Sequence, residues 1–287
     1  LYCDNIGAIV CDLRRCPLSA WKQHYLILTG AFRSAAEYGK LRAALPALRK
    51  RTPQGDGHPV LVLPGFSAND GMMSPLRNFL EEKGYNAHAW EGGYNMGLTD
   101  KTATHLRERL EEIFKQNNNR KVTLIGHSLG GIYARELARE FPDMVRNVIT
   151  VGTPFGAGIE KKSVPASLRA LIEMLGNGNL SLNDADSAQR LLPPPPVPTT
   201  SIFSKEDGVA GWKSCLNPAA PQAENIEVKA GHIGLIWSPE TFKIVMERLA
   251  QPEGNWQPFG TPSRETPPKN PGWKSGSGDS LFRKNAK

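Results

Sequence analysis

The segment at residues 122–131, VTLIGHSLGG, constrains the fold of this 287-residue chain more than any other feature. A short apolar run leads into GHSLG at 126–130, and apolar residues then recur at helical spacing, at Ala134, Leu137, Ala138 and Phe141. This order predicts a buried strand, a sharp turn that carries Ser128, and a helix. Pro142 would end that helix, and the apolar run at 145–151 would complete a βαβ unit.

Ser128 in such a turn is a candidate nucleophile. Glycines on both sides of the serine allow the strained backbone that a strand-to-helix elbow needs. A serine hydroxyl needs a histidine base and a carboxylate that orients the histidine. The alternative is that Ser128 only caps the helix after a glycine-rich turn.

His232 is the candidate base. It is the one histidine that follows Ser128 in the chain, it lies between Gly231 and Gly234, and it comes just after a predicted strand at 225–229. After an elbow of this kind, the acid and then the histidine follow the serine in chain order. The alternative is a surface histidine or one buried in the core. His127, inside the motif, is expected to point elsewhere.

The carboxylate is expected between Ser128 and His232, after a strand at 199–203. Asp207 is the first candidate because Gly208 allows a tight turn behind it. Glu206 is the second candidate. Asp184 and Asp186 precede this strand in a polar stretch and are interpreted as solvated loop residues.

Two backbone amides are candidates for an oxyanion hole. Leu129 follows the nucleophile and supplies the first N–H. Phe66 supplies the second, because it follows a predicted strand at 59–63 in the turn that begins with Pro64-Gly65. The alternative for Pro64-Gly65 is an ordinary turn, which this pair also favours.

With these positions filled, the chain resembles an α/β-hydrolase of the lipase and carboxylesterase kind over residues 58–250. The most lipase-like stretches are GHSLGG and ITVGTPFGAG. The resemblance implies a triad of Ser128, Asp207 and His232, an oxyanion hole from Phe66 and Leu129, and no metal or organic cofactor. Many lipases have His-Gly where this chain has Pro64-Gly65, so the geometry of the oxyanion loop is not carried over.

The predicted fold is α/β, a mostly parallel, doubly wound sheet of about six strands with flanking helices. The expected strands lie at 59–63, 85–90, 121–125, 146–151, 199–203 and 225–229. The expected helices lie near 74–83, 101–115, 131–141 and 239–249. In the first of these helices, Ser74 is expected as the cap and Pro75 in the first turn.

Three regions surround or interrupt this core. Residues 1–57 are expected to form two helices that pack on a catalytic domain at 58–251, the first with Trp21, Tyr25, Leu28 and Phe32, the second with Leu41, Leu45 and Leu48. A lid insertion is expected at about 155–198, after the fourth strand. Its apolar stripe would cover an acyl pocket or pack on the sheet edge; the stripe is Leu168, Leu171, Ile172 and Leu175. Residues 252–287 are expected to be a disordered basic tail.

Charge and hydropathy limit the partners. The formal net charge is +7, and the tail supplies six basic residues against three acidic ones, so the pI gives little support to nucleic-acid binding. No apolar run of 18 residues is present in the sequence, so no transmembrane segment is expected. No export pattern is found either, which favours a cytoplasmic location, although the chain begins with Leu1 and its start is open.

The four cysteines are expected as free thiols, with a disulfide among Cys3, Cys11 and Cys16 as the alternative.

These observations predict a serine esterase or lipase that acts on small-molecule or lipid esters, with transient contact to a lipid surface in the lipase case. An acyltransferase or thioesterase would use the same triad, and the motif does not separate these reactions. A non-catalytic binding module on the same scaffold is the alternative from a different class. Failure to react with any serine-directed probe would favour that alternative.

Overall fold

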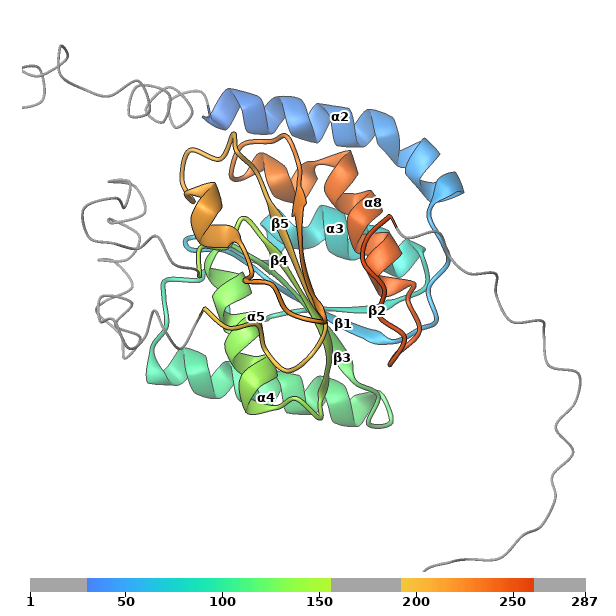
Figure 1. The fold of residues 1–287 in the computed structure, drawn as a ribbon, viewed down its shortest axis with the longest axis vertical. Helices are drawn as coiled ribbons and strands as arrows, with labels where there is room; N and C mark the ends of the chain where they lie inside the picture. Colours follow the sequence, from blue (N-terminus) through green and yellow to red (C-terminus); the bar gives the residue numbers. More distant parts are fainter. Residues whose placement is uncertain (1–29, 156–191, 261–287) are drawn as a thin grey trace, which may run out of the picture.

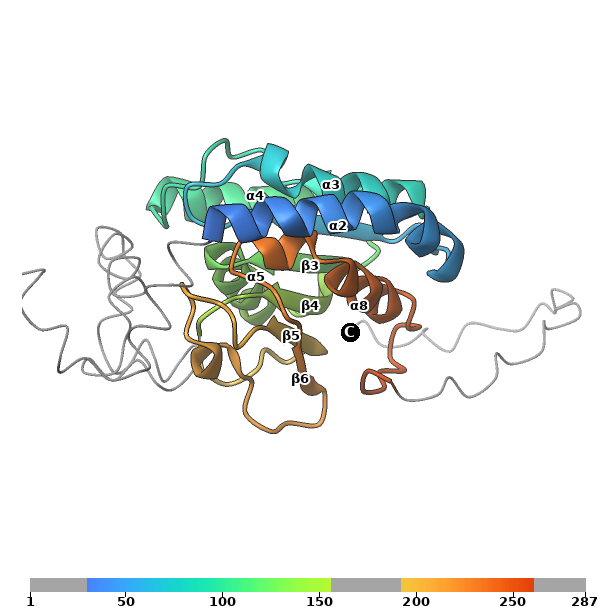
Figure 2. The ribbon, with the colours of Figure 1, turned by 90° about the horizontal axis from the view of Figure 1, so that it is seen from above.

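A six-stranded sheet organises the molecule (Figure 1). The computed structural model describes residues 30–155 and 192–260. All strand pairs are parallel, in the order β2-β1-β3-β4-β5-β6. The strands are β1 Pro59–Leu63, β2 Asn86–Ala89, β3 Val122–His127, β4 Val145–Val151, β5 Thr199–Phe203 and β6 Ala223–Glu227. Figure 2 shows β3 to β6 side by side in this order, with β6 at the far edge.

Helices cover both faces of the sheet. In Figure 1, α2, α3 and α8 lie over one face and α4 and α5 over the other. The helices are α2 Gly30–Arg51, α3 Asp70–Glu82, α4 Asp100–Gln116, α5 Leu129–Glu140 and α8 Pro239–Leu249. Two short 3₁₀ helices, η1 Trp212–Cys215 and η2 Gly234–Trp237, complete the described elements. The prediction of a doubly wound α/β sheet is confirmed, and the sheet is parallel throughout.

The strands contribute side chains to two hydrophobic cores, one on each face of the sheet. Along β1, Leu61 and Leu63 pack with α4 and α5, whereas Val60 and Val62 pack with α3 and α8. Neighbouring side chains of a strand point to opposite faces, so a strand covered by helices on both sides is buried at every position. This explains why β1, β3 and β5 are buried along their whole length while the edge strands β2 and β6 are partly exposed.

The strand order places a switch point between β1 and β3. The chain first runs from β1 outward to β2, then returns and builds the rest of the sheet on the other side of β1. In open parallel sheets the loops after the two strands at such a point diverge and leave a crevice. Those loops here are the Pro64–Ser67 turn after β1 and the Ser128 elbow after β3.

The start predicted for α3 is wrong by one turn. The helix begins at Asp70, and the side chain of Asn69 caps it by accepting from Gly71 N at 3.0 Å. Pro75 therefore lies inside the helix and leaves the carbonyl of Gly71 without its usual backbone donor. The Ser74 hydroxyl donates to that carbonyl at 2.8 Å. Ser74 and Pro75 look like a helix start in the sequence, but this local hydrogen bond lets the proline sit farther in.

Smaller differences concern the ends of other elements. The last strand ends at Glu227 and begins at Ala223, two residues before the predicted range. Near the N-terminus, α2 is one helix from Gly30, and its Leu41 and Leu48 are buried against the core of α3 and α8. Tyr38 of α2 makes an edge contact with Trp237 of η2 at 5.4 Å between ring centroids.

Some expectations fall outside the described residues. These are the helix predicted around Trp21, Tyr25 and Leu28, the lid stripe with Leu168, Leu171, Ile172 and Leu175, the loop acids Asp184 and Asp186, most of the tail, and three of the cysteines. The fourth, Cys215, is a buried free thiol. No helix within residues 30–155 and 192–260 is long and apolar enough to cross a bilayer.

Candidate active site

Ser128 occupies a strained backbone conformation at the junction of β3 and α5. Its φ is 51° and its ψ is −119°, a combination that a residue with a side chain adopts only when its surroundings enforce it. Its N–H donates to Val151 O at 2.9 Å, which ties the junction to the end of β4. The side chain makes no capping hydrogen bond to α5, so nothing supports the interpretation of Ser128 as only a helix cap.

The glycines of the motif are required by close contacts, two with backbone oxygens and one with a threonine side chain. A Cβ on Gly126 would lie 2.3 Å from Gly130 O, and a Cβ on Gly130 would lie 2.4 Å from Leu63 O. A Cβ on Gly131 would lie 2.0 Å from Thr153 Oγ1. All three distances are far below van der Waals contact, so the ends of β1, β3 and β4 meet at this elbow only because these residues lack side chains.

Asp207 and His232 form a buried contact. His232 Nδ1 lies 2.7 Å from Asp207 Oδ2, and the two side chains are 11% and 1% exposed. The other carboxylate oxygen of Asp207 accepts from Val209 N at 2.7 Å and from Ala210 N at 2.8 Å. One oxygen of the carboxylate is thus fixed by two backbone amides and the other faces His232 Nδ1, so a proton on Nδ1 would leave Nε2 as the ring nitrogen with a free lone pair.

Glu206 does not share this position. Its carboxylate pairs with Arg33 of α2, whereas the adjacent Asp207 contacts His232. The turn after β5 is held by the Ser204 hydroxyl, which accepts from Glu206 N at 3.0 Å and from Ala230 N at 3.3 Å. This second bond joins the loop that carries the acid to the loop that carries the histidine.

Gly152 lies close to both the Ser128 elbow and the Asp207–His232 pair. It follows Val151, the residue that accepts the Ser128 N–H, and its φ is +58°. A Cβ at this glycine would lie 3.3 Å from Asp207 Oδ2 and 3.4 Å from His232 Nδ1. The loops after β3, β5 and β6, which carry the three candidate residues, thus meet around the end of β4.

The turn after β1 lies against the elbow. A Cβ on Gly65 would lie 3.1 Å from the Cβ of Ser128, so the turn passes directly beside the serine. Within residues 30–155 and 192–260, the N–H of Phe66 donates to no protein acceptor. Leu129 is the first residue of α5, and its N–H belongs to the first-turn amides that have no acceptor inside a helix. Both proposed donors therefore lie next to Ser128.

His127 contacts the candidate base, so the expectation that its side chain points elsewhere is wrong. Its Nε2 lies 3.1 Å from the carbonyl oxygen of His232, and the two rings are 4.9 Å apart. Burial, together with the neighbouring His232, lowers the pKa of His127 to about 3. The imidazole is therefore neutral at pH 7 and donates from Nε2 to that carbonyl. No pattern within β3 could reveal a partner 105 residues away in the chain.

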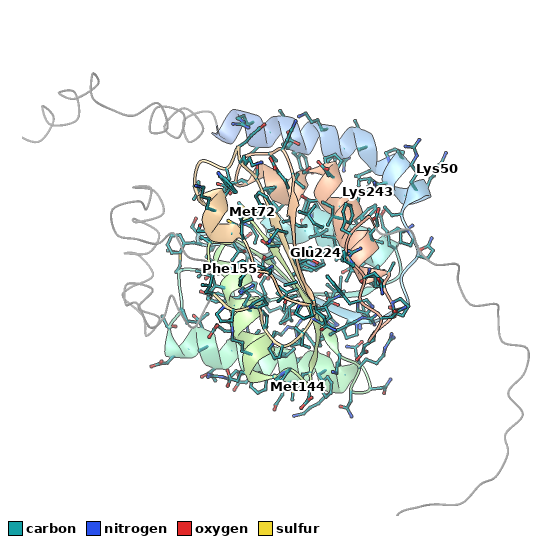
Figure 3. All side chains as sticks on the ribbon, viewed as in Figure 1. Lys50, Met72, Met144, Phe155, Glu224 and Lys243 are labelled. Carbon is teal, nitrogen blue, oxygen red and sulfur yellow. The ribbon has the colours of Figure 1, made fainter. Side chains whose placement is uncertain are left out.

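Arg135 of α5 holds the two described ends of the segment predicted as an insertion. Its guanidinium lies 3.6 Å from the ring centre of Phe155, which Figure 3 labels close to α5. It also donates to Pro193 O at 2.9 Å and to Asn217 Oδ1 at 2.7 Å. Burial lowers the pKa of Arg135 to about 9, and these acceptors compensate the buried cation.

Among the described residues, no group of three His, Cys, Asp or Glu side chains is arranged as a metal site. The chemistry that the site offers is that of a hydroxyl, an imidazole, a carboxylate and two backbone donors. This set is able to carry out acyl transfer.

Comparisons with known proteins agree with this architecture. Residues 58–169 match the family described as alpha/beta hydrolase fold. The structure of a monoacylglycerol lipase from Paleococcus ferrophilus superposes with a TM-score of 0.51 and 17% identity, covering 69% of this chain and 96% of the lipase. This likeness concerns the fold.

Two curated proteins are similar over shorter stretches. An uncharacterized protein of Saccharomyces cerevisiae is 37% identical over 71 residues, which are 24% of this chain and 11% of that protein. A pimeloyl-acyl-carrier-protein methyl ester esterase of Shewanella woodyi is 29% identical over 99 residues, or 34% of this chain and 37% of the esterase. The chain thus spans about a tenth and about a third of the lengths of these relatives.

Proposed function

Because this chain has the α/β-hydrolase fold, we propose that it hydrolyses carboxylic esters through an acyl-enzyme on Ser128. The observation that carries the proposal is the largely buried contact of 2.7 Å between Asp207 and His232, at the carboxyl ends of the strands, where Ser128 is held with a φ of 51°. A nucleophile, its base and the group that orients the base are the parts that this chemistry needs.

In the first half of the reaction, Ser128 Oγ attacks the carbonyl carbon of the ester while His232 Nε2 accepts the hydroxyl proton. The carbonyl electrons move onto oxygen, and the N–H groups of Phe66 and Leu129 stabilise this oxyanion. When the tetrahedral intermediate collapses, the bond to the alcohol oxygen breaks and His232 returns the proton to that oxygen. The alcohol leaves, and the acyl group remains on Ser128.

In the second half, water attacks the acyl carbon and His232 accepts its proton. Collapse of the second intermediate breaks the bond to Ser128 Oγ, which regains the proton from His232, and the carboxylic acid is released. Asp207 keeps the proton of the neutral imidazole on Nδ1 and stabilises the imidazolium in both halves. The reaction consumes water and ester, and every step written here is carried by residues of this chain.

The substrate class proposed is a small-molecule or lipid ester. The similarity to a methyl ester esterase over 99 residues supports an ester substrate. Three apolar side chains near the site are exposed, Tyr94 by 66%, Met96 by 64% and Ile233 by 37%, and Ile233 directly follows His232. Such residues favour contact with an acyl chain or, transiently, with a lipid surface.

Replacing Ser128 by alanine is expected to abolish ester turnover and leave the protein folded, because the hydroxyl is the attacking group while the fold uses only the backbone of this residue. The measurements are turnover of p-nitrophenyl esters of increasing acyl length, covalent labelling by a fluorophosphonate located by mass spectrometry, and thermal melting. Ser74→Ala, at a partly exposed position of α3, is the control: it removes the hydroxyl bond to Gly71 O but should keep both labelling and turnover.

Folded wild-type protein that is not labelled at Ser128 would overturn the proposal, as would unchanged turnover in Ser128→Ala. A turnover maximum at short acyl chains would indicate an esterase, and a maximum at long chains that rises further on emulsified ester would indicate a lipase.

A further inference from the structure

Asn95 is a buried polar residue in the loop between β2 and α4. Its exposed fraction is 0%, whereas its neighbours Tyr94 and Met96 are 66% and 64% exposed. A buried amide is stable only when its donors and acceptors are paired, so a lone asparagine facing inward between two exposed side chains calls for an explanation. Its partners lie on two other parts of the molecule.

Three hydrogen bonds join Asn95 to the turn after β1. Its side-chain Nδ2 donates to Pro64 O at 2.8 Å. Its backbone N–H donates to Ala68 O at 2.8 Å, and its backbone carbonyl accepts from Ser67 N at 2.7 Å. Phe66 lies between these attachment points. One residue therefore fixes the turn on both sides of the proposed oxyanion donor.

The remaining side-chain atom of Asn95 reaches α5. Its Oδ1 accepts from the Tyr133 hydroxyl at 3.0 Å and from Gly97 N at 3.3 Å. Tyr133 is buried and lies one turn beyond Leu129, the residue with the second proposed donor. Pro64 O accepts and Gly97 N donates, so the amide of Asn95 fits its site in one orientation only.

The turn needs this support because its backbone is strained. Ser67 has a φ of 55°, which a residue with a side chain seldom adopts. Oxyanion donors act by being fixed in advance where the negative charge develops, and a displacement of a few tenths of an ångström weakens them. A residue that links Pro64, Ala68 and α5 keeps the two N–H groups at a constant separation.

We propose that Asn95 is a positioning residue that holds the Phe66 N–H in register with the Leu129 N–H. This inference rests on the proposed function of the site. Asn95 touches neither Ser128 nor His232 in the described contacts, so it acts through the turn and not on the substrate. Tyr133 supports it from α5 by fixing the orientation of the amide.

Asn95→Asp tests the inference, because it keeps the size of the side chain and replaces the Nδ2 donor by an oxygen that faces the carbonyl of Pro64. Tyr133→Phe is the milder second variant and removes only the hydroxyl that orients Asn95. Asn86→Asp is the matched control: Nδ2 of Asn86 also donates to a single oxygen, Asn117 Oδ1 at 2.7 Å, but this pair is exposed at the start of β2. Asn86 therefore lies at the end of the sheet where the strands begin, opposite the candidate site.

The readouts are kcat and KM for a p-nitrophenyl ester, and the inhibition constant of a trifluoromethyl ketone, which forms a tetrahedral adduct with an oxyanion. We expect kcat to fall about 10- to 100-fold in Asn95→Asp and about 3- to 10-fold in Tyr133→Phe, since loss of a whole donor costs about 10²- to 10³-fold. The inhibition constant should rise by the same factors while KM stays within about twofold. Asn86→Asp should match the wild type.

A purely structural role would lower the melting temperature without this parallel between kcat and ketone affinity. The inference is overturned if both variants, measured well below their melting temperatures, keep wild-type kcat, or if kcat falls while ketone affinity does not. If Asn95→Asp does not fold, Tyr133→Phe decides by the same criteria. Failure of the proposed function has a different signature, namely wild-type protein that neither turns over esters nor reacts with a fluorophosphonate.

Discussion

At the scale of single residues, the candidate site depends on side chains that hold other residues in place. His127 donates to the carbonyl of His232, and the backbone amides of Val209 and Ala210 hold Asp207. These contacts fix the base that would transfer the proton and the carboxylate that would orient that base. Precise placement of the base matters because proton transfer needs heavy-atom distances of roughly 2.6–3.2 Å.

His127 provides a prediction at this scale. His127→Leu removes the donor to the His232 carbonyl and leaves a part-buried acceptor unpaired, which costs at most about 1–3 kcal/mol. We expect kcat to fall by about tenfold or more as the His232 loop shifts. His127→Gln places an amide N–H near the position of Nε2 and should retain most of the activity. Steady-state kinetics on both variants measure the difference.

The comparison of the two variants separates the hydrogen bond from the loss of the ring. His88→Leu is a further control, because His88 is another histidine with a buried Nε2 but lies on the edge strand β2. It should leave kcat unchanged. Equal kcat for His127→Leu and His127→Gln would contradict a positioning role for the donor.

At the scale of elements, the elbow joins β3 to α5 through contacts that leave no space for side chains. The end of β1 lies in close contact with Gly130, and the loop after β4 lies in close contact with Gly131. These approaches bring three strand ends within reach of one serine. Side chains at these positions would separate the strands, so the glycines determine both the packing and the geometry of the site.

The elbow yields a stability prediction. Gly126→Ala would place a Cβ 2.3 Å from Gly130 O, a backbone atom that cannot move without shifting α5. We expect the free energy of unfolding to fall by about 3 kcal/mol or more, as strong overpacking does. Gly39→Ala is the matched control, since its Cβ would meet nothing within 4 Å on the exposed side of α2. It should raise stability by about 0.5–1 kcal/mol.

Urea unfolding of both variants measures these changes. A free energy of unfolding for Gly126→Ala within about 1 kcal/mol of the wild type would show that the elbow relaxes more easily than the contacts imply. A decrease for Gly39→Ala would contradict the helical, exposed environment of that residue.

At the scale of the whole molecule, the end of the sheet where the strands begin and the end where they finish have different roles. The candidate site lies at the carboxyl ends of the strands, and a polar cluster around the buried His58 lies at the opposite end of the sheet, where β1 begins. His58 contacts Asp56, and its Nε2 lies 3.0 Å from Thr123 Oγ1 on β3. Burial, and then the charge of Arg146, lowers the pKa of His58 to about 4.

This cluster predicts a loss of stability in acid. Between the ordinary histidine pKa of 6.5 and about 4, the unfolded chain binds a proton at residue 58 that the folded chain does not. The free energy of unfolding should therefore fall as the pH decreases through this range, by about 1.4 kcal/mol for each pKa unit of difference. His127, with a pKa of about 3, acts in the same direction.

Urea unfolding at several pH values between 7 and 4 tests this prediction in the wild type and in His58→Asn. The variant is expected to be less stable at pH 7, because it loses the buried ring, but to depend less steeply on pH. Parallel pH dependences in the two proteins would contradict the assignment to His58.

The sequence by itself determined the type and order of the elements and the candidate residues. Apolar runs of strand length and helical spacing around GHSLG are local properties, and they gave the doubly wound sheet. Chain order and a following glycine were sufficient to select His232 and Asp207, the pair that lies in contact at 2.7 Å. The start of α3 was predicted wrongly because Ser74 and Pro75 carry the same local signal as a true helix start.

Only the tertiary structure decided which distant groups meet. The register of β3 beside β1 and β4 sets the Ser128 elbow against the Pro64–Ser67 turn and Gly152, and no local pattern encodes that register. The roles inferred for Asn95 and His127 have the same origin, since their partners are 31 and 105 residues away in the chain. Local preferences act over a few residues, whereas a buried hydrogen bond between loops exists only after the sheet has brought its strand ends together.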